Sequence, residues 1–147
     1  MKLYLGADHR GFKLKNALVD WLRDLGYDVK DKGALSYEPT DDYPDFAFLV
    51  GEAVVADPGS LGVLICGSSI GVTVAANKVK GVRAASACSV SEVEHGREHD
   101  HLNVLTLAAD RMSLEQAKEF VLAFIRTEPL SEERFVRRVE KIKAYEK

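Results

Sequence analysis

The sequence predicts an α/β protein whose roughly five-stranded parallel sheet is covered by helices in a three-layer α/β/α sandwich, with an additional C-terminal helix. Strand-like and helix-like runs alternate about five times along the chain, and this order indicates parallel strands joined by helical crossovers. The run at 61–66 holds no polar side chain, which is typical of a central strand covered on both faces. A length of 147 residues fits one compact domain, so we expect residues 1–147 to form a single domain.

The first half of the chain predicts two strands and two helices. Residues 2–7 form a short apolar strand, and residues 12–25 carry apolar side chains at mostly helical spacing. Gly26 stands where a helix C-cap belongs, and a brief strand at 27–30 follows. Residues 32–44 contain a glycine, two prolines and paired aspartates, which indicates a loop, and residues 45–55 have a helical pattern.

The second half predicts three more strands, at 61–66, 82–87 and 104–108. A tight loop at 67–71 leads into a helix. Ser91 with Glu94, and Ser113 with Gln116, have the spacing of capping boxes and each predicts a helix start. After Pro129, the chain predicts a final charged helix that begins near residue 131.

Composition excludes several classes of protein. Hydrophobic residues make up 46% and charged residues 29%, enough for a core and a well-solvated surface. A net charge of −3 argues against a general nucleic-acid binder. No apolar run is long enough for a membrane span, and the N-terminus lacks a signal-peptide pattern. Two cysteines are too few for a disulfide scaffold, so we expect a soluble cytoplasmic protein with reduced thiols.

Cys66 is the strongest candidate for chemistry. It ends an apolar strand and precedes a Gly/Ser loop, at the edge of a parallel sheet where ligands bind. A thiol beside a helix N-terminus can react as a thiolate, and loop amides can hold an oxyanion. An inert core cysteine fits the same position equally well. Cys88 lacks such a loop, and we expect a structural role for it. The loop lacks the glycine patterns of ATP and NAD sites.

Histidines and arginines supply the remaining candidates. We expect the polar residues that flank the fifth strand to gather at the same edge as Cys66: His99, Asp100, His101, Asp110 and Arg111. His95 and His99 share a helix face, but Gly96 departs from the zincin pattern, and we expect no metal there. Arg134 and Arg138 also lie four apart and suit a phosphate monoester, although a surface salt-bridged helix is the commoner reason for such a pair.

Taken together, the motifs resemble the type B ribose-5-phosphate isomerase family, whose superfamily includes the galactose-6-phosphate isomerase subunits. Each motif alone is weak, and the ordered set is specific. The matching stretches are Gly6-Ala7-Asp8-His9-Arg10-Gly11-Phe12, Asp42-Tyr43-Pro44, Leu64-Ile65-Cys66-Gly67-Ser68, Ala75-Ala76-Asn77-Lys78, Arg97-Glu98-His99, Asn103-Val104 and the Arg134/Arg138 pair.

The resemblance implies a Rossmann-like fold without a dinucleotide and a homodimer or homotetramer whose sites lie between subunits. It implies an aldose–ketose isomerase that interconverts ribose 5-phosphate and ribulose 5-phosphate through an enediolate. Such chemistry needs a base, an acid and an oxyanion site, so we expect no metal and no cofactor. The expected partner is a small sugar phosphate, with no nucleic acid and no membrane.

The resemblance also implies a role for each matching residue. Cys66 would be the base, Ser68 and the loop amides would stabilise the enediolate, and His99 would assist ring opening. Asp8 would contact sugar hydroxyls. The phosphate would be bound by His9, Arg111, Arg134 and Arg138, some of them from the partner chain. Tyr43, Gly67, Ser69, Gly71 and Asp100 complete the expected substrate-binding set.

Three positions refine this hypothesis. Val72 stands where other family members carry a glutamate, so the chain is similar to the cysteine-dependent type. Asp100 and Ser69 replace the usual asparagine and glycine, which leaves the preferred sugar open. The alternatives are a six-carbon substrate, such as allose or galactose 6-phosphate, and a non-catalytic sugar-phosphate-binding protein. A metal-dependent hydrolase is weaker still.

Overall fold

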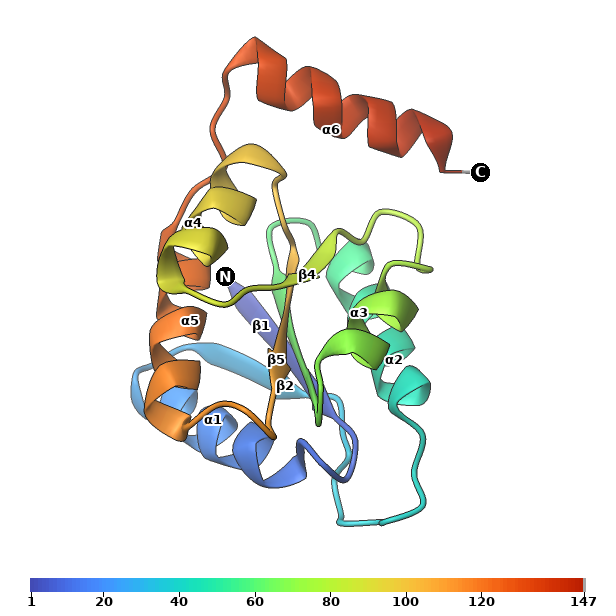
Figure 1. The fold of residues 1–147 in the computed structure, drawn as a ribbon, viewed down its shortest axis with the longest axis vertical. Helices are drawn as coiled ribbons and strands as arrows, with labels where there is room; N and C mark the ends of the chain where they lie inside the picture. Colours follow the sequence, from blue (N-terminus) through green and yellow to red (C-terminus); the bar gives the residue numbers. More distant parts are fainter. Residues whose placement is uncertain (147) are drawn as a thin grey trace.

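The computed structural model describes residues 1–146, and these residues contain five strands and six helices, as the sequence predicts (Figure 1). In chain order the elements are β1 (Lys2–Ala7), α1 (Phe12–Asp24), β2 (Asp28–Asp31), α2 (Tyr43–Ala56), β3 (Leu61–Cys66), α3 (Ile70–Ala76), β4 (Ala84–Ser86), α4 (Val90–His99), β5 (Val104–Ala108), α5 (Leu114–Arg126) and α6 (Glu133–Tyr145).

The sheet is parallel throughout, with strand order β2-β1-β3-β5-β4. Helices α1, α4 and α5 cover one face and α2 and α3 cover the other, so the predicted three layers are confirmed (Figure 1). β3 lies at the centre and every residue in it is buried, because both of its faces meet apolar side chains.

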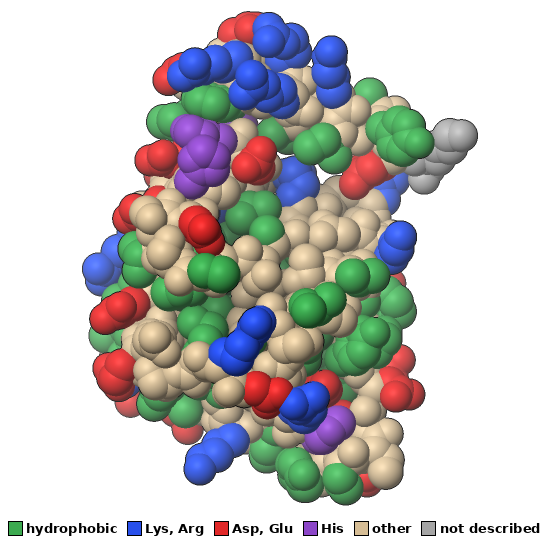
Figure 2. All heavy atoms as spheres, in the orientation of Figure 1, with side chains coloured by type: hydrophobic (Ala, Val, Ile, Leu, Met, Phe, Trp, Pro, Cys, Tyr) green, Lys and Arg blue, Asp and Glu red, His purple; other side chains and the backbone are tan. Residues whose placement is uncertain are grey.

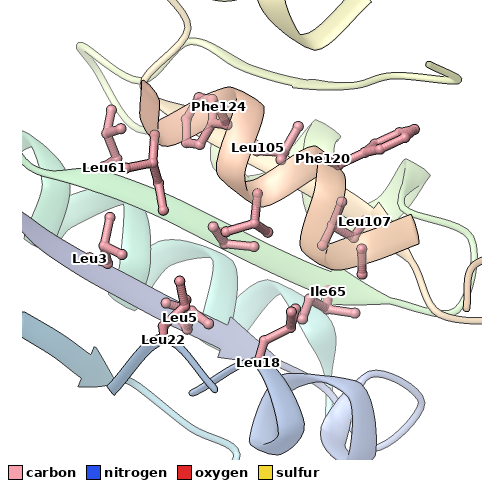
Figure 3. Close-up of a cluster of buried hydrophobic side chains, with 14 of the residues drawn as sticks. Leu3, Leu5, Leu18, Leu22, Leu61, Ile65, Leu105, Leu107, Phe120 and Phe124 are labelled. Atoms are coloured by element: carbon pink, nitrogen blue, oxygen red, sulfur yellow. The ribbon is translucent and has the colours of Figure 1, made fainter. Parts of the chain in front are cut away.

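Two apolar clusters, one on each face, hold the layers together. The larger joins the sheet to α1 and α5 and is drawn in Figure 3, where leucines of β1, α1 and β5 meet phenylalanines of α5. The smaller joins α2 and α3 to the opposite face. Burying a leucine or phenylalanine side chain contributes about 1.5–3 kcal/mol, so this packing fixes the sheet as a rigid base for the loops at its ends.

Several predicted boundaries differ from the structure. Ser89, not Ser91, caps α4: its Oγ accepts a hydrogen bond of 3.2 Å from the backbone N–H of Glu92. The predicted strand 82–87 is shorter, covering only Ala84–Ser86. The capping box of Ser113 and Gln116 is confirmed.

Helix α6 lies apart from both helical layers, across the amino edge of the sheet, where the strands begin (Figure 1). Phe135 and Val139 are buried and attach the helix to the body of the domain. The preceding segment is tied to α4, because the backbone N–H of Leu130 donates to the carbonyl of Glu98 at 3.0 Å. Within residues 1–146, no helix combines the length and apolar character needed to cross a membrane.

Candidate active site

At the carboxyl edge of the sheet, where the strands end, the order of the strands reverses between β1 and β3. The chain leaves β1 toward β2 on one side and returns to β3 on the other, and ligands bind at such a reversal in α/β sheets. The loops after the two strands touch at Gly67. A Cβ atom at that position would collide with the guanidinium of Arg10, so glycine allows this close approach.

Cys66 ends β3 at this edge as a free thiol, and it is only 4% exposed. Its carbonyl accepts the Ala109 N–H at 2.9 Å, and the Gly67 carbonyl accepts the Asp110 N–H at 3.1 Å. These two bonds hold the thiol and the following loop against the end of β5. Ser69, next in the loop, has φ +68°, a left-handed conformation that favours glycine and is unusual for serine.

Ser68 and Arg111 meet across this loop. The Arg111 guanidinium donates to the Ser68 carbonyl at 2.9 Å, and the exposed Ser68 hydroxyl accepts the Ile70 N–H at 3.3 Å. Arg111, Ser69 and Cys88 line an adjoining cavity of about 240 Å³. Arg111 therefore lies where the sequence predicts it. Cys88 is exposed at this cavity and does not pack in a core.

Tyr43 packs against the loop 67–71 at the point where the loop enters α3. It begins α2, and its ring lies against Gly71, where a Cβ atom would be 2.7 Å from the ring carbon Cζ. The Tyr43 ring can pack this closely because residue 71 has no side chain. The structure thus places Tyr43 against the start of α3, at the end of the loop that follows Cys66.

Asp8 and His9 follow β1 at the same edge. Asp8 is buried, and its Oδ1 accepts the N–H groups of Arg10 and Gly11 at 3.0 and 3.1 Å. His9 is bound by Asp41, whose Oδ1 accepts both the His9 backbone N–H at 2.9 Å and Nδ1 at 2.8 Å. Ligand atoms of these three residues lie within 4.8 Å of one another, a spacing that could hold a cation. However, Oδ1 of each aspartate is already occupied by protein N–H groups.

The prediction that His99, Asp100 and His101 gather with Cys66 is wrong within one chain. His99 and Asp100 end α4 immediately before β5 begins, and residues that precede a parallel strand lie at the amino edge. Arg134 and Arg138 on α6 lie at that edge too (Figure 1). Figure 2 shows histidine side chains in two separate places, one beneath α6 and one toward the opposite end of the molecule.

The amino edge presents its own ordered group of side chains. The His99 ring stacks on Phe135 of α6, with centroids 4.2 Å apart and planes 7° from parallel. His99 Nδ1 lies 3.2 Å from His95 Nε2, and the Arg134 guanidinium lies 4.6 Å from the centre of the Phe135 ring. Lysine and arginine side chains gather over α6 (Figure 2). This edge therefore combines an imidazole with positive charge.

Arg97 and His101 hold this edge together instead of facing a ligand. The Arg97 guanidinium donates to the carbonyls of Leu102 at 2.6 Å and Thr127 at 3.1 Å, and burial lowers its pKa. His101 Nε2 lies 3.0 Å from the Leu130 carbonyl. Asp100, by contrast, is exposed and lines a cavity of about 970 Å³ bounded by α4, β4 and α6.

Sequence reasoning missed two residues of the carboxyl edge. Arg10 belongs to the matching stretch after β1, but the sequence alone assigns it no role. In the structure its guanidinium packs against Gly67 and pairs with Asp110. Asp41 was one of two loop aspartates, and only the three-dimensional path of the loop shows that it binds His9. Adjacent aspartates carry no sequence signal that could have distinguished Asp41 from Asp42.

Known proteins resemble this chain along nearly its whole length. The family model for ribose/galactose isomerase matches residues 3–142. Ribose-5-phosphate isomerase B of Mycobacterium tuberculosis strain H37Rv is 39% identical over 147 residues, covering 100% of this chain and 91% of the relative. The enzyme of that name from Escherichia coli K12 is 40% identical over 124 residues, covering 84% and 83%.

Solved structures agree with these sequence matches. Ribose-5-phosphate isomerase B of Mycoplasma genitalium, described with bound ribulose-5-phosphate, has a TM-score of 0.92 and 38% identity, covering 99% of this chain and 95% of the other. The type B ribose 5-phosphate isomerase of Trypanosoma cruzi has a TM-score of 0.93 and 36% identity, covering 99% and 98%. On the strength of its sequence and its fold together, the chain belongs to the ribose/galactose isomerase family.

Proposed function

We propose that this chain, as one domain of residues 1–147, interconverts ribose 5-phosphate and ribulose 5-phosphate. The observation that carries the proposal is that the buried thiol of Cys66 ends the central strand at the carboxyl edge of the sheet, the same edge at which Asp8 and His9 follow β1 and Arg111 follows β5. The Mycoplasma genitalium relative, described with bound ribulose-5-phosphate, has the same fold and supports this substrate.

In this proposal Cys66 moves the proton. Its sulfur takes the proton from C2 of the open-chain aldose and returns it to C1, while O1 gains a proton and O2 loses one. The carbonyl thereby moves from C1 to C2 through an enediolate. Ser68 and the neighbouring loop amides stabilise the negative oxygens. Asp8 contacts sugar hydroxyls, and the phosphate binds to His9 and Arg111, which fixes the reacting carbons against the thiol.

We further propose that the complete site is shared between two copies of the chain. His99, which assists ring opening, lies at the edge opposite to Cys66, as do the phosphate-binding arginines Arg134 and Arg138. In a two-fold dimer the amino edge of one chain can meet the carboxyl edge of its partner, and the symmetry then makes two equal sites. Ile142 and Tyr145 of α6 are exposed beside the large cavity and offer apolar surface for such an interface.

The activity is tested with a panel of five- and six-carbon aldose phosphates, assayed for ketose formation in the presence of EDTA. We expect turnover to be fastest with ribose 5-phosphate and unaffected by the chelator, because the proposed steps require no metal. Loss of activity with EDTA, and its recovery with a divalent ion, would instead implicate the Asp8, His9 and Asp41 group. Ligand-dependent stabilisation without turnover would identify a binding protein.

The shared site is tested by subunit complementation. Cys66→Ala retains an intact amino edge and His99→Ala retains an intact carboxyl edge, so a hybrid dimer contains one fully native site. Random mixing of the two variants should restore roughly a quarter of the wild-type activity. Native mass spectrometry measures the hybrid fraction. Hybrids that form and remain inactive would contradict the shared site.

A six-carbon aldose phosphate remains the second candidate substrate, because two site positions depart from the family pattern. Ser69 holds a left-handed conformation beside the thiol and adds a hydroxymethyl group where glycine is usual. Asp100 adds a carboxylate at the amino edge. The substrate panel decides between the two sugars. A cytoplasmic location is a prediction from the sequence only.

A further inference from the structure

We propose that Asp41 is a positioning residue for phosphate recognition, acting through His9. The inference rests on the proposed function, in which His9 binds the phosphate of the substrate. Asp41 belongs to none of the motifs that carry the family resemblance, yet its carboxylate makes two hydrogen bonds to His9, at 2.9 Å to the backbone and 2.8 Å to the ring.

The loop that carries Asp41 is attached to the end of β1, which places it beside His9. Ala7 N–H donates to the Gly33 carbonyl at 2.8 Å, and Ala34 N–H donates to the Ala7 carbonyl at 2.7 Å. The buried Lys15 ammonium binds Asp31 at 2.6 Å, which secures the start of the loop. These bonds fix the start of the loop, and the exposed residues 35–40 lead from there to Asp41, whose N–H donates to the Glu38 carbonyl at 3.1 Å.

The carboxylate determines which ring nitrogen of His9 remains for a ligand. A carboxylate can only accept, so the Nδ1 bound by Asp41 must carry a proton, and Nε2 is left as the free ring nitrogen. A phosphate oxygen also accepts. His9 can donate to it only with protons on both nitrogens, as an imidazolium placed between two anions. Asp41 thus sets the ring orientation and balances the charge that phosphate binding requires.

The burial of Asp41 strengthens this assignment. Its side chain is only 11% exposed, and its Oδ2 is buried without a hydrogen-bond partner among residues 1–146. A buried carboxylate with a free oxygen is costly to hold unless its charge is matched. The nearest group that can match it is the ring of His9. A purely structural role would need only the bond to the His9 backbone, and the two roles can be separated by mutation.

A double-mutant cycle separates a structural role of Asp41 from its proposed role in phosphate recognition. We expect Asp41→Ala and His9→Ala each to raise the dissociation constant of inorganic phosphate, measured by titration calorimetry, about tenfold, and the double variant to bind no more weakly than His9→Ala alone. In the His9→Ala background the backbone N–H of residue 9 is still present. A structural effect of Asp41→Ala would therefore add to the loss, and that result would overturn the proposal.

Two variants and one spectroscopic measurement complete the test. Asp41→Asn keeps a neutral acceptor and should raise the constant less than Asp41→Ala. Asp42→Asn is the matched control, because Asp42 is the exposed neighbour and makes no side-chain cap on α2. Nitrogen-15 NMR of the His9 ring should show the proton on Nδ1 in the wild type and lose that preference in Asp41→Ala. An unchanged tautomer would reject the role of Asp41.

The phosphate measurement also distinguishes a failure of the proposed function from a failure of the role proposed for Asp41. If the wild type binds phosphate and does not isomerise sugars, the proposed function fails and the cycle still tests Asp41. If His9→Ala binds phosphate as tightly as the wild type, the assigned role of His9 is wrong and Asp41 cannot act through it.

Discussion

The two edges of the sheet hold their polar side chains in different ways. At the carboxyl edge, short loops are fixed by backbone hydrogen bonds and close packing, as at Cys66, Gly67 and Asp8. At the amino edge, the polar side chains project from helices α4 and α6, and Asp100 and Arg138 are exposed to solvent. The carboxyl edge consists of closely packed loops beside a cavity of about 240 Å³, whereas the amino edge presents side chains outward around a cavity of about 970 Å³.

Under the proposed shared site, this difference gives one chain two half-sites. A helix that joins two parallel strands ends where the next strand begins, so α4, which follows β4, delivers its last residues to the start of β5, away from the carboxyl edge. No rearrangement of loops within one fold brings His99 to Cys66. In the proposed dimer, the association of two chains would do so without changing either edge.

The largest expected effect is at the carboxyl edge. Cys66→Ala should lower kcat by about a thousandfold or more, because it removes the thiol that we propose takes the substrate proton. Steady-state assays with ribose 5-phosphate measure the loss, and circular dichroism verifies that the variant is folded. The matched control is Cys88→Ala, the other thiol of the chain, which should retain most of its activity. Near-normal turnover by Cys66→Ala would move the base to another residue.

Phosphate binding from the amino edge should show the next largest effect. Arg138→Ala should raise KM for ribose 5-phosphate by roughly 10- to 100-fold, the value of a lost charged hydrogen bond, and Arg134→Ala should act in the same direction. Arg137→Ala is the control on the same helix, because Arg137 is engaged by Glu133 at 2.7 Å. Equal effects at positions 137 and 138 would indicate that only the general charge of α6 matters.

The sequence predicts the strands and helices that form both edges of the sheet. It does not by itself show that His99 and Cys66 lie at opposite edges. Continuous apolar runs locate β1, β3 and β5 to the residue, because parallel strands that are covered on both faces consist almost entirely of apolar residues. The end of β4 and the cap of α4 were less well predicted, since nearby serines offer several equivalent caps. The pairing of Asp41 with His9 depends on the path of a long loop, and local sequence preferences do not specify that path.

Asp100 tests whether the exposed amino edge also selects the sugar. Asp100→Asn keeps the shape of the side chain and removes its charge. We expect the ratio of kcat/KM between five- and six-carbon aldose phosphates to change a few-fold, with little change in Tm, because a solvent-exposed carboxylate contributes little to folding. The same substrate panel measures the ratio. An unchanged ratio would assign Asp100 to solvent or to masking by a neighbouring charge.

The smallest expected effect comes from a charged residue that lies near the start of the strands and has no part in the proposed site. Asp57 accepts a hydrogen bond of 2.9 Å from the Tyr4 hydroxyl and pairs with Lys2 at 3.1 Å. The bonds from Tyr4 and then Lys2 lower the pKa of Asp57 below its usual value of 3.8. A carboxyl whose pKa is lower in the folded chain stabilises the fold above its usual pKa, and this stabilisation disappears as the pH falls through the folded value.

Asp57→Asn should therefore lower Tm at pH 7 by no more than about 2 °C, since the pair is largely exposed to solvent. The difference in Tm from the wild type should shrink as the pH is reduced through the range in which the carboxylate gains its proton. Turnover of ribose 5-phosphate at pH 7 should not change. A loss of activity in Asp57→Asn would mean that charge anywhere near this edge affects the site, and the special status given to His99, Arg134 and Arg138 would then be lost.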